Sequence, residues 1–164
     1  MLKVVKQLVL SGALVALTFG NAFAEEILKP FVLGYKTSGD IQAVADEVKG
    51  KVEAAGFEIA GSYSPYDGAI ILAITNDDLK KAAASTEFGG YIAGQRVTVT
   101  QVGDEIQVSY TNPLYLANTY RLEDTSGPTS ALKSLETALG NEETYGTGKK
   151  QLTAADLRKY HYMF

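Results

Sequence analysis

The sequence predicts an α+β fold built on an antiparallel sheet, and three observations indicate it. One strand and one long amphipathic helix come first, about four strands follow with a single short helical insertion, and another helix closes the series. Strands and helices do not alternate regularly, as they would in a doubly wound parallel sheet. The chain also has 164 residues, 46% hydrophobic and 21% charged, which is typical of one globular domain.

The first predicted strand covers 31–37, FVLGYKT, where apolar and polar residues alternate. A helix follows, because apolar residues recur at three- and four-residue spacing over 41–55 of an otherwise charged segment. Thr37 or Ser38 is expected to cap this helix, with Asp40 near its positive end.

The middle of the chain predicts two strands and a shorter helix. Residues 57–63 alternate, whereas 69–75, AIILAIT, form a continuous apolar run and are expected to be the most buried strand. The helix covers 76–86, has a thin apolar face, and can be capped by Asn76 or Asp77.

A β-hairpin and a second long helix come next. Residues 91–102 and 105–111 alternate on either side of Gly103-Asp104, a two-residue turn signal with glycine first. The helix covers 126–140, where Pro128 suits the first turn and leucines and alanines form an apolar stripe.

The last part of the chain, about 141–164, is interpreted as a C-terminal extension. Residues 141–151, NEETYGTGKKQ, are expected to be a flexible loop. Thr153 and Asp156 have capping-box spacing and predict a short helix, after which 160–164 are expected to be extended.

Residues 1–24 are predicted to be a secretory signal peptide. Two lysines precede an uncharged apolar stretch, and Ala22 and Ala24 occupy the small-residue positions before a cut after Ala24. The apolar stretch is shorter than the roughly 20 residues that span a bilayer. We therefore expect one soluble domain over 25–164, exported to a bacterial periplasm and without a stable membrane anchor after cleavage.

Composition and charge exclude several activities. The chain has no cysteine, which excludes thiol chemistry, and one histidine, which cannot supply a transition-metal site alone. No Gly-x-Ser-x-Gly motif suggests a serine nucleophile. The formal net charge is −4 and no cluster of lysines and arginines occurs, which argues against a nucleic-acid partner. We predict no catalytic residues, no metal site and no cofactor.

Three segments together resemble the domain of unknown function 302 family: AAGFEIAG after the first helix, AIILAIT, and VSYTNPLYLANTYR. The tail LTAADLRKYHYM is similar to extensions of exported, single-domain members. The resemblance spans about 31–164, but SPYDG and TNDDLKKAAAST depart from the family pattern, which often has an Asn-Pro-like turn and a longer helix there. It implies a TATA-binding-protein-like topology, in which a curved antiparallel sheet of about five strands lies under two main helices on one face. It implies no activity.

Tyrosines provide the candidate site. The chain has 10 tyrosines and no tryptophan, and a ring with a polar tip suits ligand pockets and interfaces, although strands favour aromatic residues in any case. The short repeats SYSPY and SYTNPLY suggest that two neighbouring strand ends place tyrosines side by side. The candidate ligand- or partner-binding residues are Tyr110, Asn112, Tyr115, Tyr120, Tyr63, Tyr66 and His161.

Within SYTNPLYLANTYR the three tyrosines differ. Tyr110 is in register with Ile106 and Val108 and is therefore predicted to face the core. Pro113 ends the strand, and 114–120 are expected to form a helical turn beyond it. Tyr115 is thus favoured as the residue of this segment that contacts a ligand.

The predicted function is non-catalytic binding of a small apolar or aromatic ligand. One alternative is a protein-interaction module, with homodimer formation through the tyrosine-rich end. A second alternative is a hydrolase-type enzyme that uses Arg96 or Arg121, Tyr110 and a carboxylate.

Overall fold

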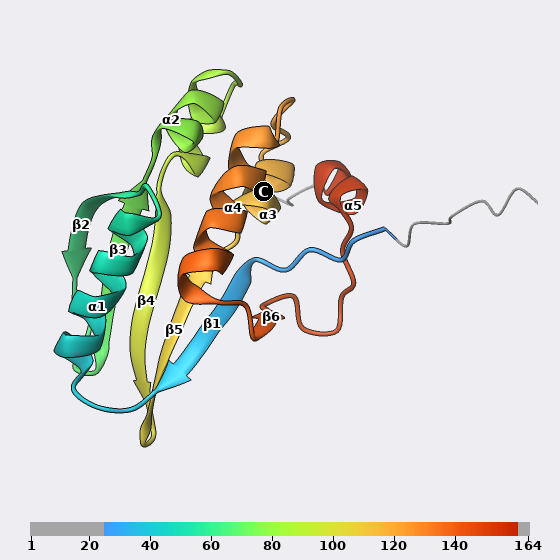
Figure 1. Ribbon diagram of the computed structural model, residues 1–164. Coiled ribbons are helices and arrows are strands. Elements are labelled where there is room, and N and C mark those ends of the chain that lie inside the picture. Colours follow the sequence, from blue (N-terminus) through green and yellow to red (C-terminus); the bar gives the residue numbers. More distant parts are fainter. Residues whose placement is uncertain (1–24, 161–164) are drawn as a thin grey trace, which may run out of the picture.

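The computed structural model describes residues 25–160, so the predicted signal peptide and the segment 161–164 lie outside the described residues. The fold is α+β, as predicted, with one antiparallel sheet (Figure 1). The strands are β1 (Phe31–Thr37), β2 (Glu58–Tyr63), β3 (Ala69–Thr75), β4 (Gln95–Val102), β5 (Glu105–Thr111) and β6 (Glu143–Tyr145). The helices are α1 (Ile41–Ala54), α2 (Asp77–Ala84), α3 (Pro113–Thr119), α4 (Ser126–Leu139) and α5 (Ala154–Lys159), with a 3-10 helix η1 (Gly89–Ile92).

The sheet has six strands in the order β2-β3-β4-β5-β1-β6, all antiparallel to their neighbours. About five strands were predicted, and the sixth, β6, lies in the segment 141–151 that was expected to be a flexible loop. That expectation was wrong because three residues pair with the exposed edge of β1, an interaction that no periodicity in so short a segment can reveal.

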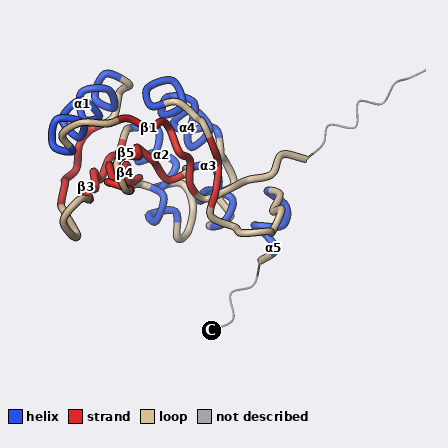
Figure 2. Tube along the Cα trace, turned by 90° about the horizontal axis from the view of Figure 1, so that it is seen from below, coloured by secondary structure: helices blue, strands red, loops and turns tan. Residues whose placement is uncertain are grey.

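The two long helices α1 and α4 cover one face of the curved sheet, as the end-on view shows (Figure 2). Between them and the sheet lies the core, to which the alternating apolar residues of the strands contribute. Fully buried members from both layers include Val48, Val52, Leu72, Ile74, Val97, Val99, Ile106, Val108, Leu135 and Leu139. The sequence prediction of two main helices on one face is confirmed.

Helix α4 approaches β1 closely at Gly34. A Cβ added at this glycine would collide with the backbone carbonyl of Leu139 at the end of the helix. The register of β1 against β5 also shifts between Leu33 and Tyr35, so a bulge lies at the same point. Glycine therefore permits both the bulge and the contact between the sheet and α4.

The capping residues agree with the sequence analysis in part. Asp40 is the N-cap of α1 and its carboxylate accepts a hydrogen bond from the Ala43 backbone, so the expectation of Thr37 or Ser38 was wrong. Asn76 caps α2, and Thr153 caps α5 in a complete capping box, as predicted. The hairpin between β4 and β5 is also confirmed, with Gly103 at φ +60°.

The C-terminal extension packs against the segment before β1 and against α3. The Leu28 backbone N–H donates to the Leu152 carbonyl at 2.8 Å. The Arg158 guanidinium donates to Asn118 Oδ1 at 2.9 Å and to the Leu122 carbonyl at 2.6 Å, which fixes α5 on α3. Within residues 25–160, no helix is both long and apolar enough to cross a bilayer.

Candidate functional site

The side chain of Tyr110 faces the core, as its register with Ile106 and Val108 predicted. Its side chain is 1% exposed in the core under α4, and its hydroxyl donates to the Gly140 carbonyl at 2.8 Å. Burial, and secondarily the negative charge of Glu136, raise the pKa of Tyr110 above its ordinary value. A general acid or base needs a pKa near the working pH, so this environment does not suit the role that the hydrolase alternative gave to Tyr110.

Asn112 is also buried, and it organises the backbone. It is the N-cap of α3, where its Oδ1 accepts hydrogen bonds from the Leu114 and Tyr115 backbones, and its Nδ2 donates to the Lys29 carbonyl. Every polar atom of the side chain is therefore engaged within the protein. Pro113 follows at the first helical position, where its missing N–H is not needed.

Tyr115 and Tyr120 lie on α3 and at its C-terminal end, respectively, but they face different surroundings. Tyr115 lines a hollow of about 200 Å³ together with the C-terminal extension, including Leu157 and Tyr160. Tyr120 stacks on Tyr91, with ring centroids 5.0 Å apart and an interplanar angle of 11°. The structure therefore divides the tyrosines of this segment between three environments.

Tyr63 and Tyr66 are exposed, at 55% and 62%, at the end of β2 and in the turn that follows it. Strands β3 and β4 separate β2 from β5, so Tyr63 and Tyr110 are not neighbours. The expectation that SYSPY and SYTNPLY lie side by side was wrong, because sequence similarity between two strand ends does not determine strand order. His161 lies outside the described residues.

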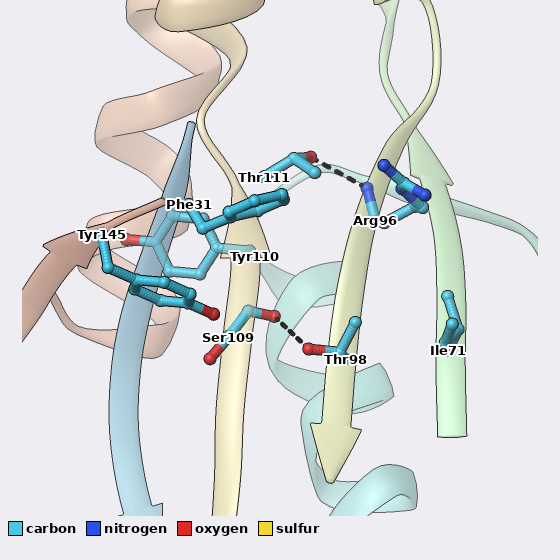
Figure 3. Close-up of a pocket in the computed structure, with 8 residues that line it drawn as sticks. All are labelled: Phe31, Ile71, Arg96, Thr98, Ser109, Tyr110, Thr111 and Tyr145. Carbon is cyan, nitrogen blue, oxygen red and sulfur yellow. Dashed lines mark hydrogen bonds between the residues drawn. The ribbon is translucent and has the colours of Figure 1, made fainter. Parts of the chain in front are cut away.

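The sheet face opposite α1 and α4 holds a separate hollow of about 230 Å³ (Figure 3). Four strands and the short edge strand β6 contribute to it. Its eight lining residues are Phe31, Ile71, Arg96, Thr98, Ser109, Tyr110, Thr111 and Tyr145. Of the candidate residues from the sequence, only Tyr110 is among them, and its side chain is directed into the core.

Strand alternation explains why these side chains share a face. In β4, Val97 and Val99 are fully buried in the core, so Arg96 and Thr98 point to the opposite side. Strand pairing then aligns the side chains in two rows across the sheet. One row contains Tyr145, Phe31 and Thr111, and the Arg96 backbone continues it through its hydrogen bond to the Thr111 hydroxyl. The other row contains Leu33, Ser109, Thr98 and Ile71.

Two aromatic rings form one side of the hollow. Phe31 and Tyr145 are directly paired between β1 and β6, with ring centroids 5.6 Å apart. They are 36% and 40% exposed, so their rings retain free surface. The hollow extends from these rings across β5 to Arg96 on β4 and Ile71 on β3 (Figure 3).

Hydroxyl groups line the base of the hollow. Thr111 donates to Gln95 Oε1 at 2.7 Å and accepts from the Arg96 backbone at 3.1 Å, which fixes its rotamer. Thr98 donates weakly to the Ser109 carbonyl at 3.4 Å. The Ser109 hydroxyl makes no hydrogen bond with any other residue of 25–160 and is therefore available to a ligand.

The hollow carries one positive charge, that of Arg96. Arg96 is exposed, and within 25–160 its guanidinium forms no ion pair or hydrogen bond. No aspartate or glutamate is among the lining residues. Among the described residues there is likewise no group of three His, Cys, Asp or Glu side chains that could hold a metal ion.

The sequence analysis missed this hollow, apart from naming Arg96 in the hydrolase alternative. The alternation of β4 and β5 was a usable signal, since it places Arg96, Thr98 and Ser109 on the face away from the valines. The aromatic side of the hollow could not be predicted from the sequence, because Tyr145 joins the site through the pairing of β6 with β1. Arg121, the other arginine named, instead donates to the carbonyls of Arg158 and Tyr160.

No protein-family model matches the chain, and no curated protein matches it in sequence. A solved structure does match, the crystal structure of an uncharacterized conserved protein DUF302 from Bacillus stearothermophilus. It is 16% identical, the TM-score is 0.53, and the alignment covers 64% of this chain and 94% of that chain. Such low identity concerns the fold alone. The chain therefore has the fold of a DUF302 protein, which confirms the fold implied by its resemblance to the domain of unknown function 302 family.

Proposed function

We propose that the chain is an exported, periplasmic binding module that takes up a small aromatic or apolar ligand without catalysis. The hollow with the Phe31–Tyr145 ring pair carries this proposal. It combines exposed aromatic surface with a few hydroxyl groups, which is the usual composition of small-molecule sites. The binding residues proposed here are those of the sheet face, whereas Tyr110 and Asn112 support the fold.

The size of the site fits a small ligand. A hollow of about 230 Å³ is smaller than the roughly 300–1,000 Å³ typical of ligand pockets, so it suits only a small ligand. A ligand of one or two rings can lie against Phe31 and Tyr145 while a polar substituent reaches Ser109. The open shape means that part of such a ligand stays in contact with solvent.

A thermal-shift screen of the chain from Glu25 against apolar and aromatic compounds tests this function, with NMR titration of each hit. A ligand in the hollow is expected to move the backbone amide signals of Thr98 and Ser109. F31A should weaken binding by about threefold to tenfold, because it removes one aromatic contact. The control Y66A removes an exposed tyrosine outside the hollow and should leave the affinity unchanged.

The second candidate function is assembly with another copy of the chain. Its supporting observation is β2, an edge strand that within residues 25–160 pairs with β3 alone and carries the exposed Tyr63. Such an edge can accept another strand through its backbone groups. Light scattering over a range of concentrations tests it: a dimer of the wild type that Y63K disrupts supports assembly, and a strict monomer excludes it.

A further inference from the structure

We propose that the ligand of the hollow is an aromatic carboxylic acid, whose carboxylate pairs with Arg96 while its ring lies against Phe31 and Tyr145. This inference rests on the proposed binding function and adds the chemical class of the ligand. It assigns Arg96 as the specificity-determining residue of the site. Three features of the hollow support it.

The first feature is the state of the Arg96 side chain. Lys36, a basic residue on the same sheet face, pairs with Glu105 at 3.6 Å. The Arg96 guanidinium has no such partner within residues 25–160, although it borders a hollow lined largely by apolar surface. Its planar set of donors matches a carboxylate in a bidentate geometry.

The second feature is the charge balance of the surroundings. The lining residues contain one cation and no anion, in a chain with formal net charge −4. The local positive charge favours an anionic ligand over a neutral one, and a cationic ligand would be repelled. A single arginine also matches one carboxylate better than a phosphate, which carries more charge and more acceptor oxygens.

The third feature is the separation of the polar and aromatic parts. Arg96 is on β4, whereas Phe31 and Tyr145 are on β1 and β6, and β5 with its Ser109 hydroxyl lies between them (Figure 3). A flat ring with a carboxylate at one end can span this arrangement. Ser109 can donate its free hydroxyl to the same carboxylate or to a substituent on the ring.

The experiment compares two probes of nearly the same shape, the anion 2-naphthoate and the neutral 2-naphthamide, by NMR titration of the chain from Glu25. The variants are R96M, which keeps a long side chain but removes its charge, and R96K, which keeps the charge but removes the planar guanidinium that can bind a carboxylate through two hydrogen bonds. K36M is the matched control. Lys36 pairs in register with Gln107 on the same sheet face, so K36M removes the same charge without touching the hollow.

We expect the wild type to bind 2-naphthoate about twofold to fivefold more tightly than 2-naphthamide, the size of an ion pair at an exposed arginine. R96M should remove this preference, R96K should retain part of it, and K36M should leave it nearly intact. The preference should also decrease as salt concentration rises. The Arg96 side chain is exposed, so the variants are expected to keep the wild-type spectrum outside the site.

Three results would overturn the inference in distinguishable ways. Equal binding of both probes, with shifts at Thr98 and Ser109 that F31A weakens, would preserve the binding function and reject the carboxylate. Absence of binding by both probes and by every compound of the wider screen would reject the binding function together with the inference. An equal loss of affinity in R96M and K36M would show a long-range charge effect instead of a contact.

Discussion

The hydroxyl of Tyr110 in β5 donates a hydrogen bond to the carbonyl of Gly140 at the end of α4, at 2.8 Å. This bond connects the centre of the sheet with the helix layer. Y110F should lower the free energy of unfolding by about 1 kcal/mol, because the carbonyl loses its donor while the ring still fills the core. Urea denaturation measures the change, and Y66F, at an exposed turn, should have no effect.

Tyr110 should also make the stability of the protein decrease at alkaline pH. Burial raises the pKa of Tyr110 in the folded state, so the folded protein resists losing this proton. Its contribution is therefore complete below about pH 10, the value of an unfolded tyrosine, and decreases as the pH rises further. The stability difference between wild type and Y110F should narrow above about pH 10; a difference that stays constant from pH 8 to 11 would contradict the prediction.

Substitution by alanine should lower the stability of the protein at Gly34 and raise it at Gly50. G34A places a methyl group against the Leu139 carbonyl and should cost about 1–3 kcal/mol of stability, since β1 or α4 must shift. G50A lies within α1 with no atom near the new Cβ, and should stabilise the protein by up to about 1 kcal/mol. Thermal and urea unfolding of both variants provide the test, in which equal effects would argue against the close contact.

Both the oxygen and the nitrogen of the Asn112 side-chain amide should contribute to the stability of the fold. N112A removes the cap of α3 and the bond to the Lys29 carbonyl, and should cost about 1–2 kcal/mol. N112D keeps the capping oxygen but buries a carboxylate, one oxygen of which would face the Lys29 carbonyl with no donor between them, so a loss at least as large is expected. If N112D proved clearly less costly than N112A, the cap would outweigh the bond to Lys29.

Arg158 should control the attachment of α5. R158M removes the hydrogen bonds to Asn118 and to the Leu122 carbonyl, so the extension should open locally more often. Limited proteolysis with mass spectrometry should then detect faster cleavage between 146 and 150. K159M, on the same helix but without a contact in this cluster, is the control, and equal cleavage rates would show that Arg158 does not hold the extension.

Local periodicity predicted most of the fold. The strands at 31–37, 69–75 and 105–111 have the predicted bounds, because their alternation or apolar runs are set by burial against the helices. Two elements were missed in part. Residues 89–92 form a 3-10 helix, whereas the predicted strand began at residue 91. Strand β6 forms through its pairing with β1, which no local pattern indicates.

The candidate site was less accessible from the sequence. The tyrosine count identified Tyr110, Tyr115, Tyr120 and Tyr63, yet strand order and packing distribute these residues over separate parts of the molecule. The hollow instead depends on register across four strand pairs, which brings Phe31 to Tyr145 and Thr98 to Ser109. Such long-range pairing is a property of the assembled sheet, so no local pattern encodes it.

The position of β1 in the sheet has a consequence for folding kinetics. This strand is the first along the described chain, but its partners are β5 and β6, with Phe31 opposite both Thr111 and Tyr145. Its backbone groups remain without strand partners until β5 has been made, after β2, β3 and β4. Closing such long loops is entropically costly and slows folding. We therefore expect β1, the strand that is made first, to pair late during folding.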